Sequence, residues 1–298
     1  MKSQFENRVI SSFLLWVDHE LLVEGEAFTN KDSNFYPVNS LYDGYHSYGS
    51  PFKQFVSDCS FSVTGTLGAQ VPTGVYTNGS FRATGHYVDG TNTSPLLGFN
   101  YNEGQALLNE EQTNVTISGR YAVKDFNIHL TNKAEQELLF ETKIDLREGI
   151  AQTPTGLPPN VATYPAIFIK NNGGTNTEFA LGGCESTSVN LRAIVLADSQ
   201  FKCDAACSIF KDSVRRVVPV FDDHQYPYDA LGGFKSGVPF DYDNLSANTT
   251  KNVYISDVSV SRFSLGYMEN FANSNPDIFR ALIDFTLETY RYPRLIND

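Results

Sequence analysis

The sequence predicts a mainly β protein of the α+β class. We expect two antiparallel β domains, sandwich-like or barrel-like, with a capped helix at the N-terminus and one short helix in the second half. Aromatic residues make up 13% of the 298 residues, whereas charged residues make up only 19%, and large aromatic side chains are enriched in strands. Short apolar runs bounded by turn residues recur along the chain, and helical spacing of apolar residues is clear in two segments.

The first residues of the chain have the clearest helical pattern. Ser3 and Glu6 have the spacing of a capping box, and Gly25 is expected to follow the end of the helix. Apolar residues recur at helical spacing between them, at Phe5, Ile10, Phe13, Leu14, Val17 and Leu21.

Residues 34–52 are rich in Tyr, Gly and Pro and predict ordered loops and extended segments. This stretch and its flank carry the aromatic side chains that we predict as a subunit interface, because interface cores are enriched in aromatic residues. The predicted interface residues are Phe35, Tyr36, Tyr42, Tyr45, Tyr48, Phe52 and Phe55. The alternative is that these side chains pack under their own loop.

Hairpin signals follow in pairs. Asn78 and Gly79 stand between two short extended runs, which is typical of a type I′ turn, and Gly104 suits the left-handed position of a second hairpin at 99–108. The segments 114–132 and 137–146 are predicted to continue as strands.

Three prolines within 153–160 predict a break in the chain, because proline cannot extend a strand ladder. We therefore divide the chain into an N-terminal helix with a Tyr-rich segment (1–55), a β domain rich in hairpins (56–150), a linker (151–160) and a second β domain (161–298).

The second β domain is expected to contain strands at 164–176 and 189–197. Apolar residues alternate with polar ones in 277–292, which favours a long antiparallel strand over a helix.

A short helix at 199–214 is predicted between these strands, with Asp198 or Ser199 as its cap. Its apolar stripe contains Cys203, Ala206, Cys207, Phe210 and Val214. The two cysteines face the core in this arrangement, so we interpret them as small buried side chains rather than as zinc ligands or a disulfide.

No strong catalytic pattern and no cofactor motif is found. Asp18, His19 and Glu20 point in different directions around the first helix, which indicates a solvated surface. Asp222, Asp223 and His224 are weak candidates for a divalent cation site in a loop, and a solvated turn is the alternative.

Charge and hydropathy limit the partners. The formal net charge of −12 disfavours binding to nucleic acid. The apolar run at 13–17 is far shorter than the roughly 20 residues of a membrane-spanning helix. We therefore expect neither nucleic acid nor a membrane as a partner, and a cytosolic site of synthesis.

Four stretches of the chain, "FENRVISSFLLWVDHELLVEGEAFTN", "SGRYAVKDFNIHLTN", "LRAIVLADSQF" and "LGGFKSG", resemble uncharacterised virion structural proteins of tailed bacteriophages. The resemblance implies a non-enzymatic protein that is made in the bacterial host cytoplasm and assembles into the virion. It would form a ring at the neck, connector or tail, through contacts with copies of itself and with other virion proteins. A carbohydrate- or surface-binding β module and a hydrolase with paired carboxylates are the alternatives.

Overall fold

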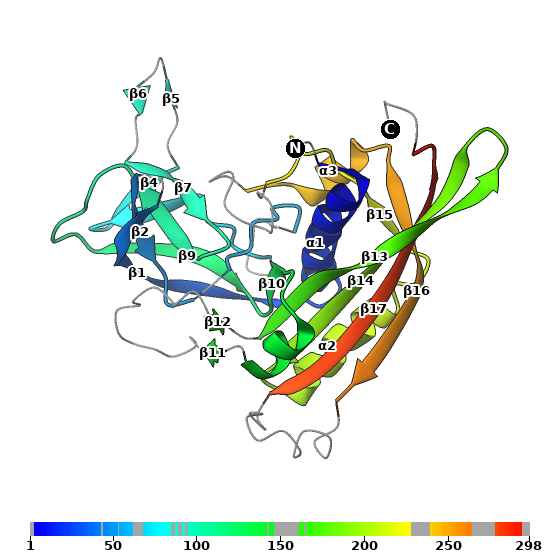
Figure 1. The fold of residues 1–298 in the computed structure, drawn as a ribbon. Helices are drawn as coiled ribbons and strands as arrows, with labels where there is room; N and C mark the ends of the chain where they lie inside the picture. Colours follow the sequence, from blue (N-terminus) through cyan, green and yellow to red (C-terminus); the bar gives the residue numbers. More distant parts are fainter. Residues whose placement is uncertain are drawn as a thin grey trace.

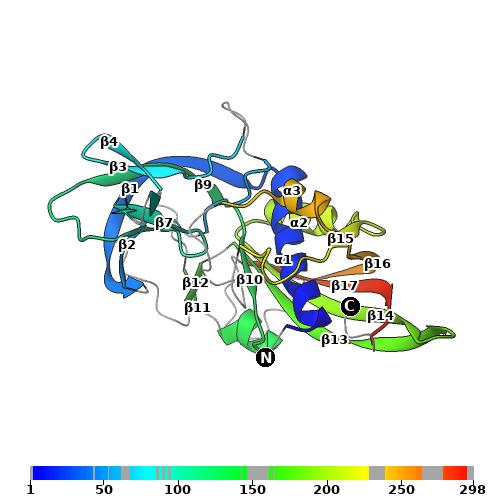
Figure 2. The same cartoon turned by 90° about the horizontal axis from the view of Figure 1, so that it is seen from above.

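The computed structural model describes residues 3–42, 44–52, 54–61, 68–84, 87–88, 91–92, 95–141, 143–145, 161–163, 165–227, 239–263 and 278–293. The protein is mainly β, with two large curled sheets and few helices, which confirms the predicted fold class (Figure 1). Figure 2 shows α1 (Phe5–Val23), α2 (Gln200–Lys211) and α3 (Tyr242–Ala247) on one side of the second sheet, with the first sheet beside them.

The first sheet has seven strands in the order β4-β3-β9-β1-β2-β8-β7, and all its pairs are antiparallel. Its strands are β1 (Phe28–Tyr42), β2 (Tyr45–Gly49), β3 (Gly74–Thr77), β4 (Ser80–Ala83), β7 (Leu96–Asn100), β8 (Gln105–Leu108) and β9 (Ile117–Lys124). The long strand β1 pairs with β9 through its first half and with β2 through its second half. The aromatic rings of Phe35, Phe55, Phe99 and Tyr121 meet in the core that this curled sheet surrounds.

The second sheet has six strands in the order β10-β13-β14-β17-β16-β15. They are β10 (Asn127–Leu130), β13 (Ala166–Ala180), β14 (Cys184–Ala197), β15 (Val217–Pro219), β16 (Asn252–Arg262) and β17 (Phe279–Arg291). Only the β10–β13 pair of this sheet is parallel. Helices α1 (Phe5–Val23) and α2 (Gln200–Lys211) bury their apolar sides against one face of the sheet, around Trp16, Phe210 and Phe285.

Smaller elements complete the described chain. They are the hairpin β5 (Tyr87–Val88) and β6 (Thr91–Asn92), the parallel pair β11 (Lys143–Asp145) and β12 (Val161–Thr163), a π-helical turn at Glu137–Glu141, and α3 (Tyr242–Ala247).

The predicted turns and the short helix are confirmed. Asn78 and Gly79 join β3 to β4 with φ values of 47° and 84°, and Gly104 joins β7 to β8 with φ of 63°. The Ser199 side chain caps α2 by accepting a hydrogen bond from the backbone N–H of Lys202 at 3.3 Å.

The predicted stripe of α2 is buried at Cys203, Ala206, Cys207 and Phe210. Val214 does not belong to it, because the helix ends at Lys211, and its side chain is 38% exposed. The strand predicted at 277–292 is also confirmed as β17, whose buried residues Ala281, Ile283, Phe285 and Leu287 occupy alternate positions.

The predicted capping box is wrong. The helix begins after Gln4, whose backbone N–H donates to the Asn7 side chain at 3.1 Å. The Ser3 hydroxyl instead donates to the carboxylate of Asp223, a residue 220 positions away.

The strand predicted at 137–146 is replaced in its first half by the π-helical turn. Leu138 and Leu139 are consecutive and both are buried against Ala166 and Phe168. A strand would have turned one of the two leucines to the opposite face.

The Tyr-rich segment, expected as loops and extended pieces, forms most of β1 and β2. The two sheets do not divide the chain at the predicted linker, because α1 and β10 both pack with the second sheet. Residues 151–160, predicted as that linker, lie outside the described residues.

Candidate functional site

Polar side chains of α1, of the segment 54–61 and of α3 meet in a buried cluster. The Asp58 carboxylate has no exposed surface, and one of its oxygens lies 2.8 Å from Nδ1 of His19. Its other oxygen accepts hydrogen bonds from the hydroxyl and backbone N–H of Ser60, at 2.6 and 3.0 Å, and from the backbone N–H of Tyr242, at 3.2 Å. The rings of His19 and Tyr242 stack with centroids 4.2 Å apart. The cluster therefore joins α1, the segment 54–61 and α3 through hydrogen bonds and ring stacking.

Electrostatics favours the charged pair at this point. Burial alone would lower the pKa of His19, but its hydrogen bond to Asp58 and the nearby charges of Asp58, Asp243 and Glu20 outweigh burial and raise it. Burial alone would raise the pKa of Asp58, but the hydrogen bonds from His19, Ser60 and Tyr242 outweigh it and lower that pKa.

The geometry of the cluster differs from that of a nucleophilic triad. The Ser60 hydroxyl lies 3.5 Å from Nδ1 of His19, on the same side of the ring as Asp58, whereas a triad needs the two groups on opposite ring nitrogens. The second ring nitrogen, Nε2, faces the carboxylate of Asp243 at 3.8 Å. Burial raises the pKa of the neighbouring Cys59 thiol, so this thiol stays protonated. The arrangement is that of a structural joint.

The other two polar residues of this part of α1 are also paired. Asp18 and the Lys124 amine of β9 form an ion pair of 2.8 Å, with side chains 4% and 8% exposed. Glu20 pairs with Arg216, which also donates to Glu24 at 2.8 Å. The prediction of a solvated surface at Asp18, His19 and Glu20 is therefore wrong. Helical periodicity could not reveal that Lys124 of the first sheet, Asp58 and Arg216 cover this side of the helix.

The acidic loop at 222–224, predicted as a weak candidate for a cation site, contacts the beginning of α1 and a residue that precedes the helix. Asp222 forms an ion pair of 2.9 Å with Arg8, and Asp223 accepts from Ser3. The side chain of His224 is exposed. Across the described residues, no group of three or more His, Cys, Asp or Glu side chains is placed to hold a metal ion.

The predicted interface residues take several positions. Phe35, Tyr48 and Phe55 are buried in the core of the first sheet, so they present no surface to another subunit. For these three residues the alternative of packing within the chain holds. Tyr36, Tyr45 and Phe52 are half-buried, and the side chain of Tyr42 lies outside the described residues. For these four the interface stays a prediction.

A projecting hairpin, here called the arm, is the most exposed apolar feature of the second sheet (Figure 1). It consists of residues 170–190, where β13 and β14 continue past the end of β10, which pairs with β13 only as far as Ile169. Phe179 is 61% exposed, Leu181 is fully exposed, and Tyr290 of β17 lies beside Phe179 with ring centroids 4.3 Å apart. Sequence reasoning missed this surface, although the apolar residues next to Gly182 and Gly183 were a signal for it.

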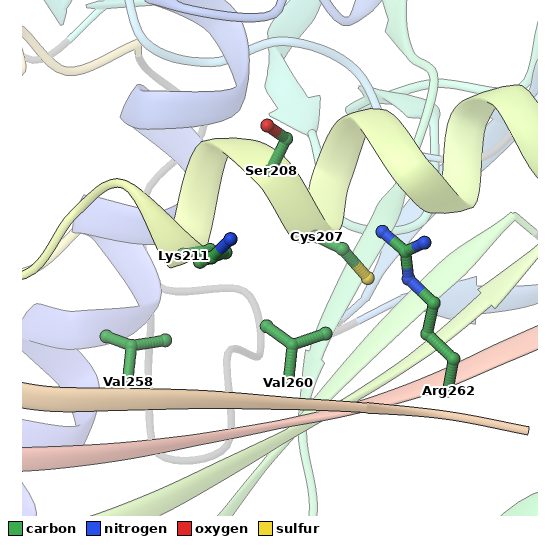
Figure 3. Close-up of a pocket in the computed structure, with 6 residues that line it drawn as sticks. All are labelled: Cys207, Ser208, Lys211, Val258, Val260 and Arg262. Carbon is green, nitrogen blue, oxygen red and sulfur yellow. The ribbon is translucent and has the colours of Figure 1, made fainter.

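A groove runs between α2 and β16 (Figure 3). It measures about 550 Å³, and its lining residues are Cys207, Ser208, Lys211, Val258, Val260 and Arg262. Figure 3 shows the sulfur of Cys207 and the guanidinium of Arg262 directed toward each other. A hydrogen bond from Cys203 lowers the pKa of Cys207, burial opposes this, and the charge of Arg262 adds to it. All four cysteines are free thiols.

A comparison with known protein families finds no family that matches the chain, and a comparison with curated proteins finds no match. No helix in the described part of the chain has the length and apolar character needed to cross a membrane.

Proposed function

We propose that the protein is a non-enzymatic structural component that assembles through protein–protein contacts. The sequence stretches that resemble tailed-phage virion proteins support a place in a virion, as a ring at the neck, connector or tail. The observation that carries the proposal is the arm, whose apolar tip is exposed to solvent.

Physical reasons support an assembly role for the arm. Exposed apolar side chains that stand together mark interaction surfaces more often than scattered ones do. Phe179 and Tyr290 form one aromatic pair, and Leu181 lies in the adjoining turn. Aromatic anchors of this kind contribute strongly to binding when a partner covers them.

A carbohydrate- or surface-binding module is the second candidate, because the exposed Tyr290 and Phe179 rings could also stack on a sugar. The one Trp of the chain does not support this function, since Trp16 is 2% exposed and packs against Phe13, Phe210 and Phe285.

Light scattering of the purified chain across a concentration series tests the proposal. We expect the wild-type chain to reach a discrete mass that is a multiple of 33.1 kDa. The variant Phe179→Ser with Leu181→Ser should stay a monomer, because it removes the apolar tip. Phe81→Ser is the control, since Phe81 is also half-exposed but lies on β4 of the first sheet. A wild-type chain that stays monomeric at every concentration would contradict self-assembly.

A further inference from the structure

The groove between α2 and β16 combines an apolar floor with positive charge. Val258 and Val260 form the floor and also pack against the main core of the second sheet. Lys211 and Arg262 stand at its sides, and Arg262 forms an ion pair of 3.0 Å with Asp204. Two cations and one carboxylate leave an excess positive charge. A volume of about 550 Å³ is that of a small-ligand site, so it can accept a few side chains but not a whole domain.

The arm has the opposite charge beside its apolar tip. Glu178 of β13 stands directly across from Glu185 of β14, and Glu185 stands across from Arg291 of β17. Like charges directly opposite in a sheet are destabilising. Two carboxylates and one guanidinium leave an excess negative charge next to Phe179 and Leu181. A partner surface with excess positive charge would complement it.

The arm cannot reach the groove of its own chain. Val258, at the near end of the groove, pairs with Phe285, which pairs with Leu191. From Leu191 to Cys184 the strand β14 runs seven residues, about 24 Å at the usual rise of about 3.4 Å per residue, and the tip of the hairpin lies farther away. The pairing is continuous along this distance, so the arm is a stiff extension of the sheet.

We infer that the arm tip of one copy docks in the groove between α2 and β16 of the next copy, with Phe179 and Leu181 over the valine floor and Glu178 near Lys211. This inference rests on the proposed function and names the two surfaces that meet. The two surfaces differ, so the contact is heterologous. A heterologous contact closes into a ring when its rotation allows and otherwise forms a filament.

Two variants test the contact because each one removes a different half of it. The arm variant carries Phe179→Ser and Leu181→Asp, and the groove variant carries Lys211→Glu and Arg262→Glu. We expect each variant alone to associate roughly tenfold or more weakly than wild type, as for residues at the centre of an interface. Neither pair of changes creates an attractive charge for the other, since both add acids.

Mixing the two variants gives the decisive result. The intact arm of the groove variant can enter the intact groove of the arm variant, whereas the reverse contact is lost. A heterologous contact therefore predicts a one-to-one dimer, measured as twice the monomer mass by light scattering, that grows no further. Far-UV circular dichroism of each variant checks that it is folded, because the mixing result can be interpreted only when both variants are folded.

The control variant carries Arg120→Glu and Lys251→Glu, which make the same change in net charge on exposed residues away from the groove. It should assemble like wild type. The inference is overturned if the groove variant assembles like wild type, or if folded variants stay monomeric when mixed. If the wild type assembles but one of these two results is found, the proposed function stands and only the contact between arm and groove is overturned. If the wild type is monomeric, the proposed function and this contact are both overturned.

Discussion

His19 makes the free energy of unfolding depend on pH. Its pKa is raised in the folded state through Asp58, Asp243 and Glu20, which outweigh burial, so the folded state binds the proton more tightly than the unfolded state does. The stabilisation by His19 is therefore complete below the unfolded pKa of about 6.5 and is lost as the pH rises through the folded pKa.

The variant His19→Asn measures this effect, because an amide can still donate to Asp58 but does not titrate. Urea unfolding of both proteins should show the largest difference in the free energy of unfolding near about pH 5 and a smaller difference near about pH 8. The emission of Trp16, the one Trp of the chain, is the probe. A difference that stays constant over this range would show that the proton on His19 adds nothing to stability.

Loss of the ion pair between Asp18 and Lys124 is also expected to lower the free energy of unfolding. Burial raises the pKa of Asp18 despite the opposing charge of Lys124, so this carboxylate depends on its partner. Lys124→Met should lower the free energy of unfolding by about 3–5 kcal/mol, since it leaves a charge buried without compensation. The double variant with Asp18→Ala should lose less than Lys124→Met alone. Equal losses in the two variants would mean that the cost comes from packing rather than charge.

Single elements were predictable where the chain determines them locally. Gly79 in this turn has φ of 84°, a backbone conformation that residues other than glycine rarely adopt. Gly79→Ala should therefore lower the free energy of unfolding by about 1 kcal/mol, measured by urea denaturation. Asn78→Gly is the control, because glycine accepts the same conformation without strain. No loss in the alanine variant would indicate that the β3–β4 turn can change its type freely.

Features that depend on neighbouring residues could be predicted from the sequence, whereas features that depend on distant residues could not. The alternating strand β17, the stripe of α2 as far as Phe210 and the two hairpin turns depend on neighbouring residues, and these were predicted. The N-terminal cap failed because Ser3 bonds to Asp223, and the polar group at Asp18 to Glu20 failed because its partners are Lys124, Asp58 and Arg216. Those partners lie 39 to 220 positions away, where periodicity carries no information.

At the scale of the whole molecule, α1 joins the two sheets. One side of it carries Phe13 and Trp16 into the core of the second sheet. Leu22 packs with Ala122 of β9 in the first sheet, and Asp18 pairs with Lys124 of the same strand. The helix is thus shared between the sheets, and the chain passes from the first sheet to the second between β9 and β10.

A second joint strengthens this connection. The buried side chain of Gln54 donates to the carbonyl oxygen of Ile128 at 2.8 Å and accepts from its backbone N–H at 2.7 Å. This is a paired contact between the segment before Phe55, in the first core, and strand β10 of the second sheet. Loss of either hydrogen bond between Gln54 and Ile128 leaves a buried polar group without that partner, which is costly.

The shared helix and the buried joints predict that the two sheets unfold in one cooperative transition. Trp16 lies in the core of the second sheet, so its emission reports on that core, whereas far-UV circular dichroism reports on strands of both sheets. The two signals should give coincident urea transitions near neutral pH, as expected for a two-state process. Two separated transitions, with circular dichroism changing while Trp16 emission does not, would mean that the first sheet unfolds alone. In that case α1 would belong to the second sheet only, and the buried pair of Asp18 and Lys124 would have to open before the core around Trp16 does.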